Sequence, residues 1–319
     1  MKKIGVLTSG GDAPGMNAAV RAVTRAALQK GYEVIGIQRG YNGLLNGETI
    51  NLGVRDVSNI IQRGGTVLYT ARCLKFKEWE NVLKAKEECD KLGLVGIVVI
   101  GGDGSFRGAA DLSKAGVPCI GLPGTIDNDI SCTDYTIGYD TAMNTAMEMI
   151  DKLRDTAMSH DRCSVVEVMG RNAGWIALNV GLAVGAVGVI TQEMPYNLDN
   201  IIAKMENSKK TMKQHFIVVV SEGIGNSEAI AQEIKEKTGI ESRATILGHV
   251  QRGGAPTLRD RVVASEMGYY AVDLLDQGIG NRVVAMKENK IVDFDIKEAL
   301  AMKKPFDENL YRIADEISF

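Results

Sequence analysis

Short runs of β-branched residues alternate with amphipathic stretches along the whole chain, and this alternation predicts an α/β fold. Strands are expected at residues 4–7, 34–37, 96–100, 117–121, 164–168, 187–190, 217–220 and 282–286. Helices are expected at residues 17–29, 78–92, 140–155, 172–184, 198–212, 227–237 and 260–276. Right-handed crossovers would join the strands into mainly parallel, doubly wound sheets flanked by helices. Ligands of such sheets bind at the carboxyl ends of the strands.

Composition and charge exclude several classes of protein. With 45% hydrophobic and 24% charged residues among 319, the chain is typical of globular proteins of about two domains. A net charge of −3 with scattered basic residues indicates no large nucleic-acid surface. The longest apolar runs have the length of strands, and no signal-peptide pattern opens the chain, so we expect a cytoplasmic protein that does not span a membrane. The five scattered cysteines are expected to be reduced, and the three histidines lack metal-ligand spacing.

Two glycine-rich loops follow predicted strands and lead into helices. The loop at residues 8–17 places free amides and glycines at a helix start, which is typical of an anion site, but it lacks the lysine of a P-loop. The loop at residues 100–108 fails the dinucleotide fingerprint, which argues against a Rossmann dehydrogenase. Its Asp103 is a candidate Mg²⁺ ligand, and the alternative is that Asp103 caps the following helix.

An acidic loop and two basic loops complete the set. Residues 123–129 place Asp127 and Asp129 two positions apart, where one carboxylate can act as a general base, although a solvated turn is the alternative. Arg171 and Arg252 stand beside glycines in loops 169–171 and 248–254, as arginines that bind phosphate often do. Together the loops predict a site for a magnesium polyphosphate and a phosphorylated polyol, and phosphoryl transfer fits them better than hydride transfer.

In these motifs the chain resembles the bacterial ATP-dependent 6-phosphofructokinases. The likeness lies in residues 7–12, 101–105, 123–129, 169–171 and 248–254, in the order and spacing of that family. The resemblance implies transfer of the ATP γ-phosphoryl group to O1 of fructose 6-phosphate, with Mg²⁺, in glycolysis. It implies that Asp127 is the base, that Asp129 supports it and helps to place Mg²⁺, and that Thr125 and Arg171 contact the transferring phosphoryl group.

The resemblance also implies binding residues. Those for ATP and its Mg²⁺ are Gly11, Tyr41, Arg72, Cys73, Gly102, Asp103, Gly104, Ser105 and Gly108. Those for the sugar phosphate are Thr125, Ile126, Asp127, Arg162, Met169, Gly170, Arg171, Glu222, Arg243, His249, Val250, Gln251 and Arg252. Arg162 and Arg243 would reach this site from a neighbouring subunit, which implies a homotetramer. The expected domains are residues 1–138 with 251–302 for ATP, and residues 139–250 with 303–319 for fructose 6-phosphate.

Two glycines favour ATP as the donor. Pyrophosphate-dependent members resemble this chain but carry a larger residue at Gly104 and a lysine at Gly124, and those side chains would occupy the space of the ATP α-phosphate. A pyrophosphate-dependent enzyme remains the first alternative. A nucleotide or sugar-phosphate sensor without turnover is the second, and Asp127 with Arg171 argues against it.

The regulatory site of the family, which binds ADP or phosphoenolpyruvate between subunits, is matched only in part. The matching residues are Arg21, Arg25, Arg154, Lys213 and His215. Val54, Val187 and Thr211 replace the usual arginine, acid and arginine. We therefore expect a weak or altered response to these two effectors.

Overall fold

The computed structural model describes residues 2–210, 212–213 and 215–318. The strands are β1 (Lys3–Ser9), β2 (Glu33–Ile37), β3 (Thr49–Asn51), β4 (Leu94–Gly101), β5 (Cys119–Pro123), β6 (Cys163–Val168), β7 (Gly188–Ile190), β8 (Phe216–Ser221), β9 (Ser242–Ile246), β10 (Arg282–Lys287) and β11 (Lys290–Asp295). The α-helices are α1 (Met16–Gln29), α2 (Gly40–Asn46), α3 (Trp79–Leu92), α4 (Asp103–Lys114), α5 (Tyr139–Ser159), α6 (Trp175–Ala183), α7 (Leu198–Lys209), α8 (Ser227–Thr238), α9 (Leu258–Asp276), α10 (Ile296–Ala301) and α11 (Glu308–Glu316). Short 3-10 helices cover Leu74–Lys77 and Gly248–Arg252.

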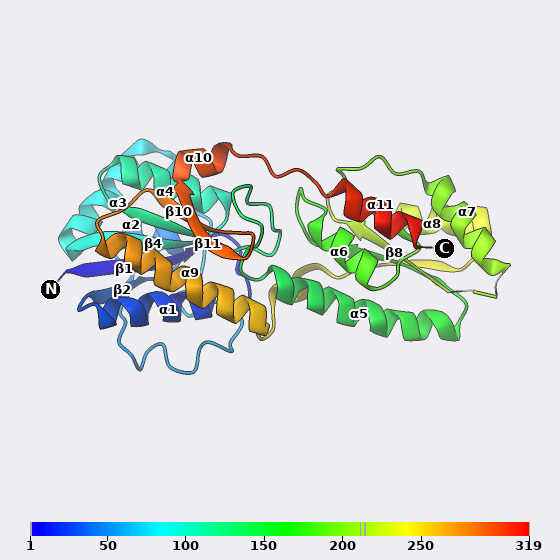
Figure 1. Ribbon diagram of the computed structural model, residues 1–319, viewed down its shortest axis with the longest axis horizontal. Helices are drawn as coiled ribbons and strands as arrows, with labels where there is room; N and C mark the ends of the chain where they lie inside the picture. The colour runs from blue at the N-terminus through cyan, green and yellow to red at the C-terminus, as the bar shows by residue number, and fades with distance from the viewer. Residues whose placement is uncertain (1, 211, 214, 319) are drawn as a thin grey trace. The chain divides into compact units, whose positions relative to one another are not determined.

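The chain divides into two compact units, each with its own sheet. The first unit comprises Met1–Ile126, Ile130–Thr141 and Arg252–Lys304. The second comprises Asp127–Asp129, Ala142–Gln251 and Pro305–Phe319. In Figure 1 the first unit runs from blue to cyan and returns in orange, and the second is mostly green and yellow with its last helix in red. Each unit is therefore built from segments that are distant in the sequence.

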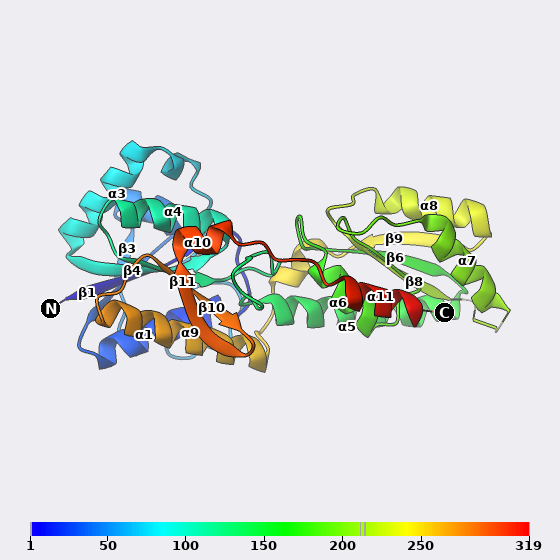
Figure 2. The same ribbon diagram turned by 45° about the horizontal axis from the view of Figure 1, so that its top comes forward.

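The sheet of the first unit has the strand order β11-β10-β5-β4-β1-β2-β3. Strand β1 pairs in parallel with β2 and β4, β4 with β5, and β5 with β10. Only β3 and β11, at the two edges, pair antiparallel to their neighbours. Helices α1 and α9 cover one face of this sheet and α3 and α4 the other (Figure 2). The predicted doubly wound, mainly parallel architecture is confirmed.

The sheet of the second unit has the order β7-β8-β6-β9 and is parallel throughout. Its central strands are fully buried or nearly so, as residues 216–221 of β8 illustrate. Apolar residues of α7 and α8 pack against one face, among them Ile201, Met205 and Ile234. Helices α6 and α11 lie on the other face (Figure 2). Continuous β-branched runs mark strands covered on both faces, and these strands were predictable for that reason.

The strands that the sequence pattern did not predict all lie at sheet edges. They are β3, β9 and β11. Their residues are mostly half-buried or exposed, so they lack the apolar runs of the central strands. The helices α2, α10 and α11 were also missed, and each has nine residues or fewer. The helix expected at 172–184 begins only at Trp175, because residues 170–173 form a turn closed by a bond from the Ala173 amide to the Gly170 carbonyl.

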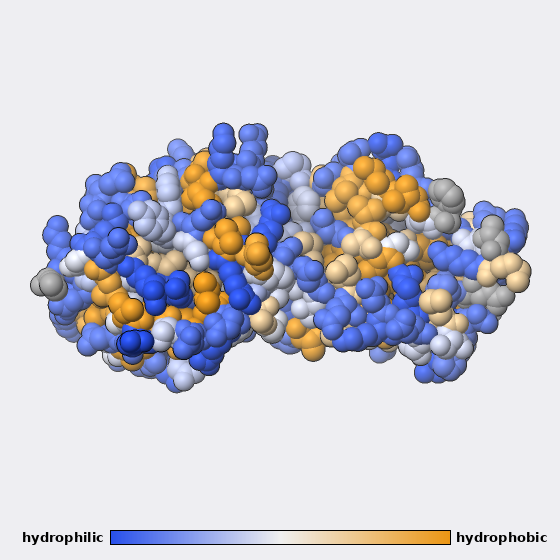
Figure 3. Space-filling view, turned by 60° about the horizontal axis from the view of Figure 1, so that its bottom comes forward, coloured by the Kyte–Doolittle hydropathy of each residue, from blue (hydrophilic) through white to orange (hydrophobic). Residues whose placement is uncertain are grey.

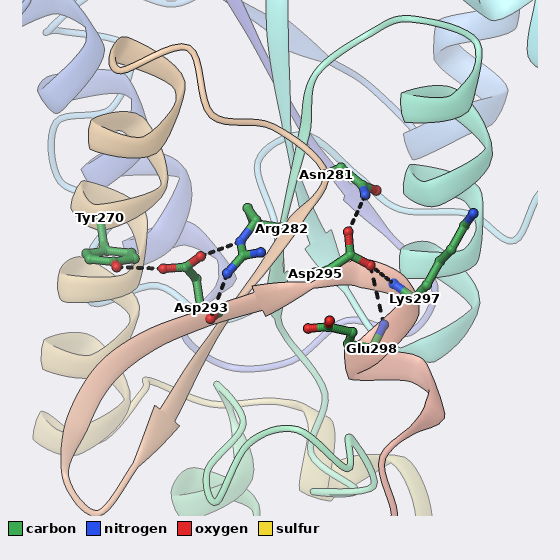
Figure 4. A network of polar contacts seen from close by, with 7 residues as sticks. All are labelled: Tyr270, Asn281, Arg282, Asp293, Asp295, Lys297 and Glu298. Atoms are coloured by element: carbon green, nitrogen blue, oxygen red, sulfur yellow. Dashed lines mark hydrogen bonds and ion pairs between the residues drawn. The ribbon is translucent and has the colours of Figure 1, made fainter.

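The edge hairpin β10–β11 is attached to its surroundings by polar contacts (Figure 4). Asp293 of β11 accepts a hydrogen bond of 2.7 Å from Tyr270 of α9 and pairs with Arg282 of β10. Asp295 caps helix α10 by accepting from the backbone amide of Lys297 at 2.8 Å. These contacts fix the edge strand, and they lie near the start of β10 rather than at its carboxyl end.

Asp260 joins the first turns of two helices in the first unit. Its side chain is completely buried, and it lies in the first turn of α9. It accepts hydrogen bonds from Tyr135 Oη, the Gly138 amide, and both the amide and the hydroxyl of Thr141, at 2.5 to 2.9 Å. The start of α5 is therefore held to the start of α9 by one carboxylate.

No described helix is long and apolar enough to cross a membrane. The hydrophobic patches on the face drawn in Figure 3 are each bordered by hydrophilic residues.

Candidate functional site

Three predicted loops meet at the carboxyl ends of β1, β4 and β5. Ser105 Oγ, in the first turn of α4 after β4, donates to the carbonyl oxygen of Ser9 at the end of β1, at 3.1 Å. The Gly124 amide, after β5, donates to the Gly101 carbonyl at 3.0 Å. A Cβ on Gly101 would lie 2.5 Å from the Ser9 carbonyl oxygen, so only glycine allows this approach. Because β1, β4 and β5 are adjacent and parallel, the segments that follow them start at the same edge of the sheet.

Arg252 closes onto the first of these loops. Its Nη1 donates to the Asp12 carbonyl at 3.0 Å, and a Cβ on Gly11 would lie 2.8 Å from the same nitrogen. The guanidinium of Arg252 therefore lies directly against the Gly11 backbone. The structure brings a predicted sugar-phosphate residue next to a predicted ATP residue within the first unit.

Asp103 lies in the first turn of α4, and Gly102, not Asp103, occupies the N-cap position. The capping alternative for Asp103 is therefore wrong. Its carboxylate pairs with Arg107 one turn later, at 2.8 Å from Nε and 3.2 Å from Nη2. A Cβ added to the neighbouring Gly104 would have no atom within 4 Å, so open space adjoins the backbone beside Asp103.

The acidic loop after β5 is almost entirely buried. Thr125 is 8% exposed and Asp127 is 5% exposed, while Asp129 is half-buried. The Thr136 hydroxyl donates to the Thr125 carbonyl at 2.6 Å, and this bond anchors the loop to the segment before α5. Asn128 takes a left-handed conformation with φ of 50° between the two aspartates. A solvated turn, the alternative to a catalytic role, is inconsistent with this burial.

Tyr41 and Gly108 are buried beneath the start of α4, and Cys73 is partly buried. Tyr41 is 3% exposed, and its hydroxyl donates to the Ser105 carbonyl at 2.6 Å. A Cβ on Gly108 would lie 2.8 Å from the Tyr41 ring, and Cys73 is partly buried against the same apolar core. Arg72 is exposed at the end of the segment that precedes Cys73. Tyr41 therefore supports the backbone at Ser105 through its buried hydroxyl.

In the second unit, the loop after β6 is held from two sides. Glu222, which follows β8, accepts hydrogen bonds from the backbone amides of Gly170, at 3.1 Å, and of Arg171. The Met169 amide donates to Gln251 Oε1 at 3.3 Å. Arg171 is exposed and has a positive φ of 58°. The structure thus brings Met169, Gly170, Arg171, Glu222 and Gln251 together at the carboxyl ends of parallel strands.

Glu193 is a residue of this region that the sequence analysis missed. Its Oε1 accepts from the Gly174 amide at 2.7 Å, at the end of the loop that carries Arg171. Four side chains at or just after the ends of β7 and β8 have buried polar atoms without a partner among the described residues, namely Thr191, Gln192, Glu193 and Ser221. The polar run Thr191-Gln192-Glu193 directly after a strand was the available signal.

Arg162 and Arg243 lie away from that loop. Arg162 directly precedes β6, and Arg243 on β9 is in register with Ser164 near the start of β6. The Arg171 loop follows the opposite end of the same strand. Within the second unit the structure therefore separates these two arginines from the other sugar-phosphate candidates. His249 and Val250 are exposed on the 3-10 helix after β9.

The five effector candidates fall into two groups. Arg21 and Arg25 lie on α1 in the first unit, where burial and then the charge of Arg25 lower the pKa of Arg21. Arg154, Lys213 and His215 lie in the second unit, where burial and then Arg154 lower the pKa of Lys213 and of His215. Val54 is exposed, Val187 is 1% exposed in the core, and Thr211 lies outside the described residues.

Comparison with known proteins decides the family. A family model described as phosphofructokinase matches residues 3–275. The chain belongs to the phosphofructokinase family. Two full-length relatives, each aligned over 100% of both chains, are named ATP-dependent 6-phosphofructokinase: one from Clostridium perfringens, numbered 1, is 57% identical, and one from Clostridium botulinum is 56% identical. The predicted resemblance is confirmed.

Solved phosphofructokinases share the fold. The phosphofructokinase of Saccharomyces cerevisiae matches with a TM-score of 0.88 and 32% identity over 99% of this chain. This chain spans 47% of the yeast chain. A pyrophosphate-dependent phosphofructokinase from Marinobacter aquaeolei matches with a TM-score of 0.86 at 22% identity, covering 97% of this chain and 86% of its own, which indicates a common fold alone.

Proposed function

We propose that this protein is an ATP-dependent 6-phosphofructokinase, which transfers the γ-phosphoryl group of ATP to O1 of D-fructose 6-phosphate and yields fructose 1,6-bisphosphate and ADP. The observation that carries the proposal is the meeting of loops 8–17, 100–108 and 123–126 at one edge of the first sheet, followed along the chain by the nearly buried Asp127. The full-length relatives that carry this activity in their names support it.

The two units divide the substrates in this proposal. Residues 9–15, 72–73 and 101–108 of the first unit hold ATP, since glycine backbone next to the start of a helix binds phosphate. The Arg171 loop, Glu222 and residues 249–251 of the second unit hold the sugar phosphate, together with Arg252. Domains at 1–138 with 251–302 and at 139–250 with 303–319 remain our assignment, close to the two compact units.

Asp127 is the general base. Its carboxylate takes the proton of the 1-hydroxyl as O1 forms a bond to the γ-phosphorus, the bond from that phosphorus to the bridging oxygen breaks, and ADP leaves with the bonding electrons. Arg171 donates hydrogen bonds to the transferring group, and a planar guanidinium suits its spread of charge. Thr125 and Asp129 flank the base and orient these groups.

The donor set fits a magnesium ion that arrives with the nucleotide. Among the described residues there is no group of three His, Cys, Asp or Glu side chains that could hold a metal. Mg²⁺ is commonly held by one or two carboxylates together with substrate phosphates. Asp103 and Asp129 are the carboxylates we assign to it, and Asp103 would exchange its exposed pairing with Arg107 for the ion. Bound there, the ion would screen phosphate charge.

The donor preference rests on Gly104. A Cβ at Gly104 would meet no protein atom within 4 Å, so the space beside it is free for the α-phosphate of ATP. A Cβ at Gly124 would be 3.0 Å from Ile100 and 3.2 Å from Met16, which makes a lysine there more difficult to accommodate. Both observations support ATP over pyrophosphate.

The first experiment measures fructose 1,6-bisphosphate formation from fructose 6-phosphate and Mg²⁺, with ATP in one reaction and pyrophosphate in the other. We expect product with ATP only. Product with pyrophosphate only would keep the family and overturn the donor argument. No product in either reaction, with both ligands still bound, would favour the sensor hypothesis.

We also propose a homotetramer in which Arg162 and Arg243 complete the sugar-phosphate site of a neighbouring subunit. Their place at the amino ends of β6 and β9, away from the Arg171 loop, supports a role outside their own site.

A weak or altered response to ADP and phosphoenolpyruvate follows from the effector residues. Val187 is packed in the core of the second unit and offers no ligand atom. Velocity curves at low fructose 6-phosphate should change little with either effector. A strong shift with either one would refute the proposal.

A further inference from the structure

Residues 63–72 form a segment without regular secondary structure that crosses the glycine loop of the first unit. The segment ends at Arg72, and its backbone reaches the loop where the Gly10 amide donates to the Ala71 carbonyl at 3.5 Å. Thr70 Oγ1 donates back to the Gly10 carbonyl at 2.8 Å. Thr8 Oγ1 donates to the Tyr69 carbonyl at 2.7 Å. One backbone bond and two side-chain hydrogen bonds therefore attach this segment to the loop.

Asn17 makes the largest set of these contacts. Its Nδ2 donates to the carbonyl oxygens of Arg63, at 3.0 Å, and of Gly64, at 3.2 Å. Its Oδ1 accepts from the amide of Val67 at 2.8 Å. The residue is 1% exposed, so water does not substitute for these bonds. The carbonyl oxygens of Arg63 and Gly64 need a donor, and the amide of Val67 needs an acceptor. Only one orientation of the Asn17 side-chain amide satisfies all three hydrogen bonds.

The position of Asn17 links this contact to the loop. It is the second residue of α1, directly after the turn at Gly15, and α1 has no side-chain cap. On the far side of the segment, Gly64 approaches the loop after Arg252 so closely that a Cβ there would lie 2.3 Å from the Gly254 carbonyl oxygen. The segment is thus fixed between α1 and residues 252–254.

We propose that Asn17 is a positioning residue for the nucleotide half of the site: its amide fixes residues 63–72 across the glycine loop and thereby sets the place of Arg72. The inference rests on the proposed function, in which Arg72 contacts ATP. Only an amide of this length supplies two donors and an acceptor here. An aspartate would place a carboxylate oxygen against two carbonyl oxygens and lose both donors.

The test compares Asn17→Asp, Asn17→Ala and Arg72→Ala with wild type, by equilibrium titration with MgATP and by kinetics. We expect Asn17→Ala to weaken MgATP binding and raise KM for ATP by about tenfold, and Asn17→Asp to do so more strongly. KM for fructose 6-phosphate should stay within about threefold of wild type, because the Arg171 loop is untouched. The double variant Asn17→Ala with Arg72→Ala should bind MgATP about as weakly as Arg72→Ala alone, because the two side chains act through one contact.

A control separates positioning from general stability. Thr24→Val lies on the same helix, is buried, and removes only a local bond to the Val20 carbonyl, so it should lower the Tm without changing MgATP affinity. Hydrogen exchange should become faster in residues 63–72 of Asn17→Ala and not in Thr24→Val. If exchange rises in that segment while MgATP affinity and KM stay at wild-type values, or if the double variant shows the sum of the two losses, the proposal is wrong.

The outcomes also separate this inference from the proposed function. Wild-type protein that binds MgATP but makes no product would overturn the kinase assignment, and the binding titrations would still decide the role of Asn17. Should Asn17→Asp fail to fold, Asn17→Ala and Asn17→Ser carry the same comparison, with Ser expected to lie between Ala and wild type.

Discussion

At the scale of single residues, the exposure of a carboxylate distinguishes the proposed catalytic aspartate from an aspartate at the surface. Asp127 is 5% exposed, whereas the acid at position 134 lies at the surface and pairs with Lys287 at 2.7 Å. These two aspartates therefore lie in different environments. The burial of a carboxylate beside a substrate site, rather than its presence in the sequence, marks the catalytic candidate.

Asp127→Asn should slow turnover by about 10²–10⁴-fold, the usual effect of removing a general base, while ATP and fructose 6-phosphate still bind. The reason is that an amide cannot take the proton of the 1-hydroxyl group. Steady-state kinetics with separate binding titrations would measure both effects. Asp134→Asn is the matched control, with turnover expected at the wild-type level, and near-normal turnover of Asp127→Asn would contradict the assignment.

Gly104→Asp should fold with an unchanged Tm and lose most of its ATP-dependent turnover. The residue has room for a side chain and no positive φ, so the fold tolerates the change, but the new carboxylate would occupy the place of the α-phosphate. Thermal unfolding and kinetics with ATP test the two parts separately. Gly104→Ala should show a smaller loss, and wild-type ATP kinetics in Gly104→Asp would refute the steric argument.

At the scale of helices and strands, buried polar side chains join elements that the chain places far apart. Asp260 in α9 binds the first turn of α5 through bonds to Tyr135, Gly138 and Thr141. Gly138 in turn approaches Ala13 of the glycine loop so closely that a Cβ on Gly138 would lie 2.7 Å from its methyl group. The start of α5 is therefore a support for that loop.

Asp260→Asn should lower the free energy of unfolding by about 1–3 kcal/mol, because the amide must face backbone or hydroxyl donors with donors of its own. Chemical denaturation with a spectroscopic probe would measure the change. Tyr135→Phe, which removes one donor and leaves Asp260 in place, should cost less. Equal unfolding midpoints for Asp260→Asn and wild type would show that the network does not stabilise the fold.

The same group gives a pH dependence with a defined sign. Burial raises the pKa of Asp260 above its usual value despite the hydrogen bonds that favour ionisation. A carboxyl whose pKa is higher in the folded state contributes most to stability at low pH and loses that contribution as the pH rises through the folded value. The stability difference between wild type and Asp260→Asn should therefore shrink as the pH rises above the ordinary aspartate pKa and through the raised pKa of Asp260 in the folded state. A difference that grows over this range would contradict the shift.

At the scale of the whole molecule, we propose that the site takes residues from more than one chain. Arg162 and Arg243 lie at the amino ends of their strands, while the Arg171 loop lies at the carboxyl end. In mixtures of Arg162→Ala and Asp127→Asn chains, some hybrid tetramers would pair an intact base with an intact arginine from its neighbour. Activity should therefore reappear in hybrids formed from two nearly inactive parents, measured after denaturation and refolding together. No recovery at any mixing ratio would count against a shared site.

The sequence by itself determined the central strands, most helices and the motif-bearing loops. Buried strands such as β4 and β8 need continuous apolar runs, and glycines at Gly11, Gly101 and Gly124 meet local demands of backbone approach, so both leave a signal in neighbouring residues. The family followed from the same loops, because their residues and spacing are specific.

Only the tertiary structure decided which distant residues serve those loops. Edge strands such as β9 are half-exposed and leave no apolar pattern, and Tyr41 proved to be a buried support of Ser105. Asn17, Glu193 and Asp260 each bond to partners whose distance in space is set by strand order and crossover connections. The periodicity of apolar residues indicates which side of one helix or strand is buried. It does not indicate which side chain of a distant helix or strand forms a hydrogen bond with it.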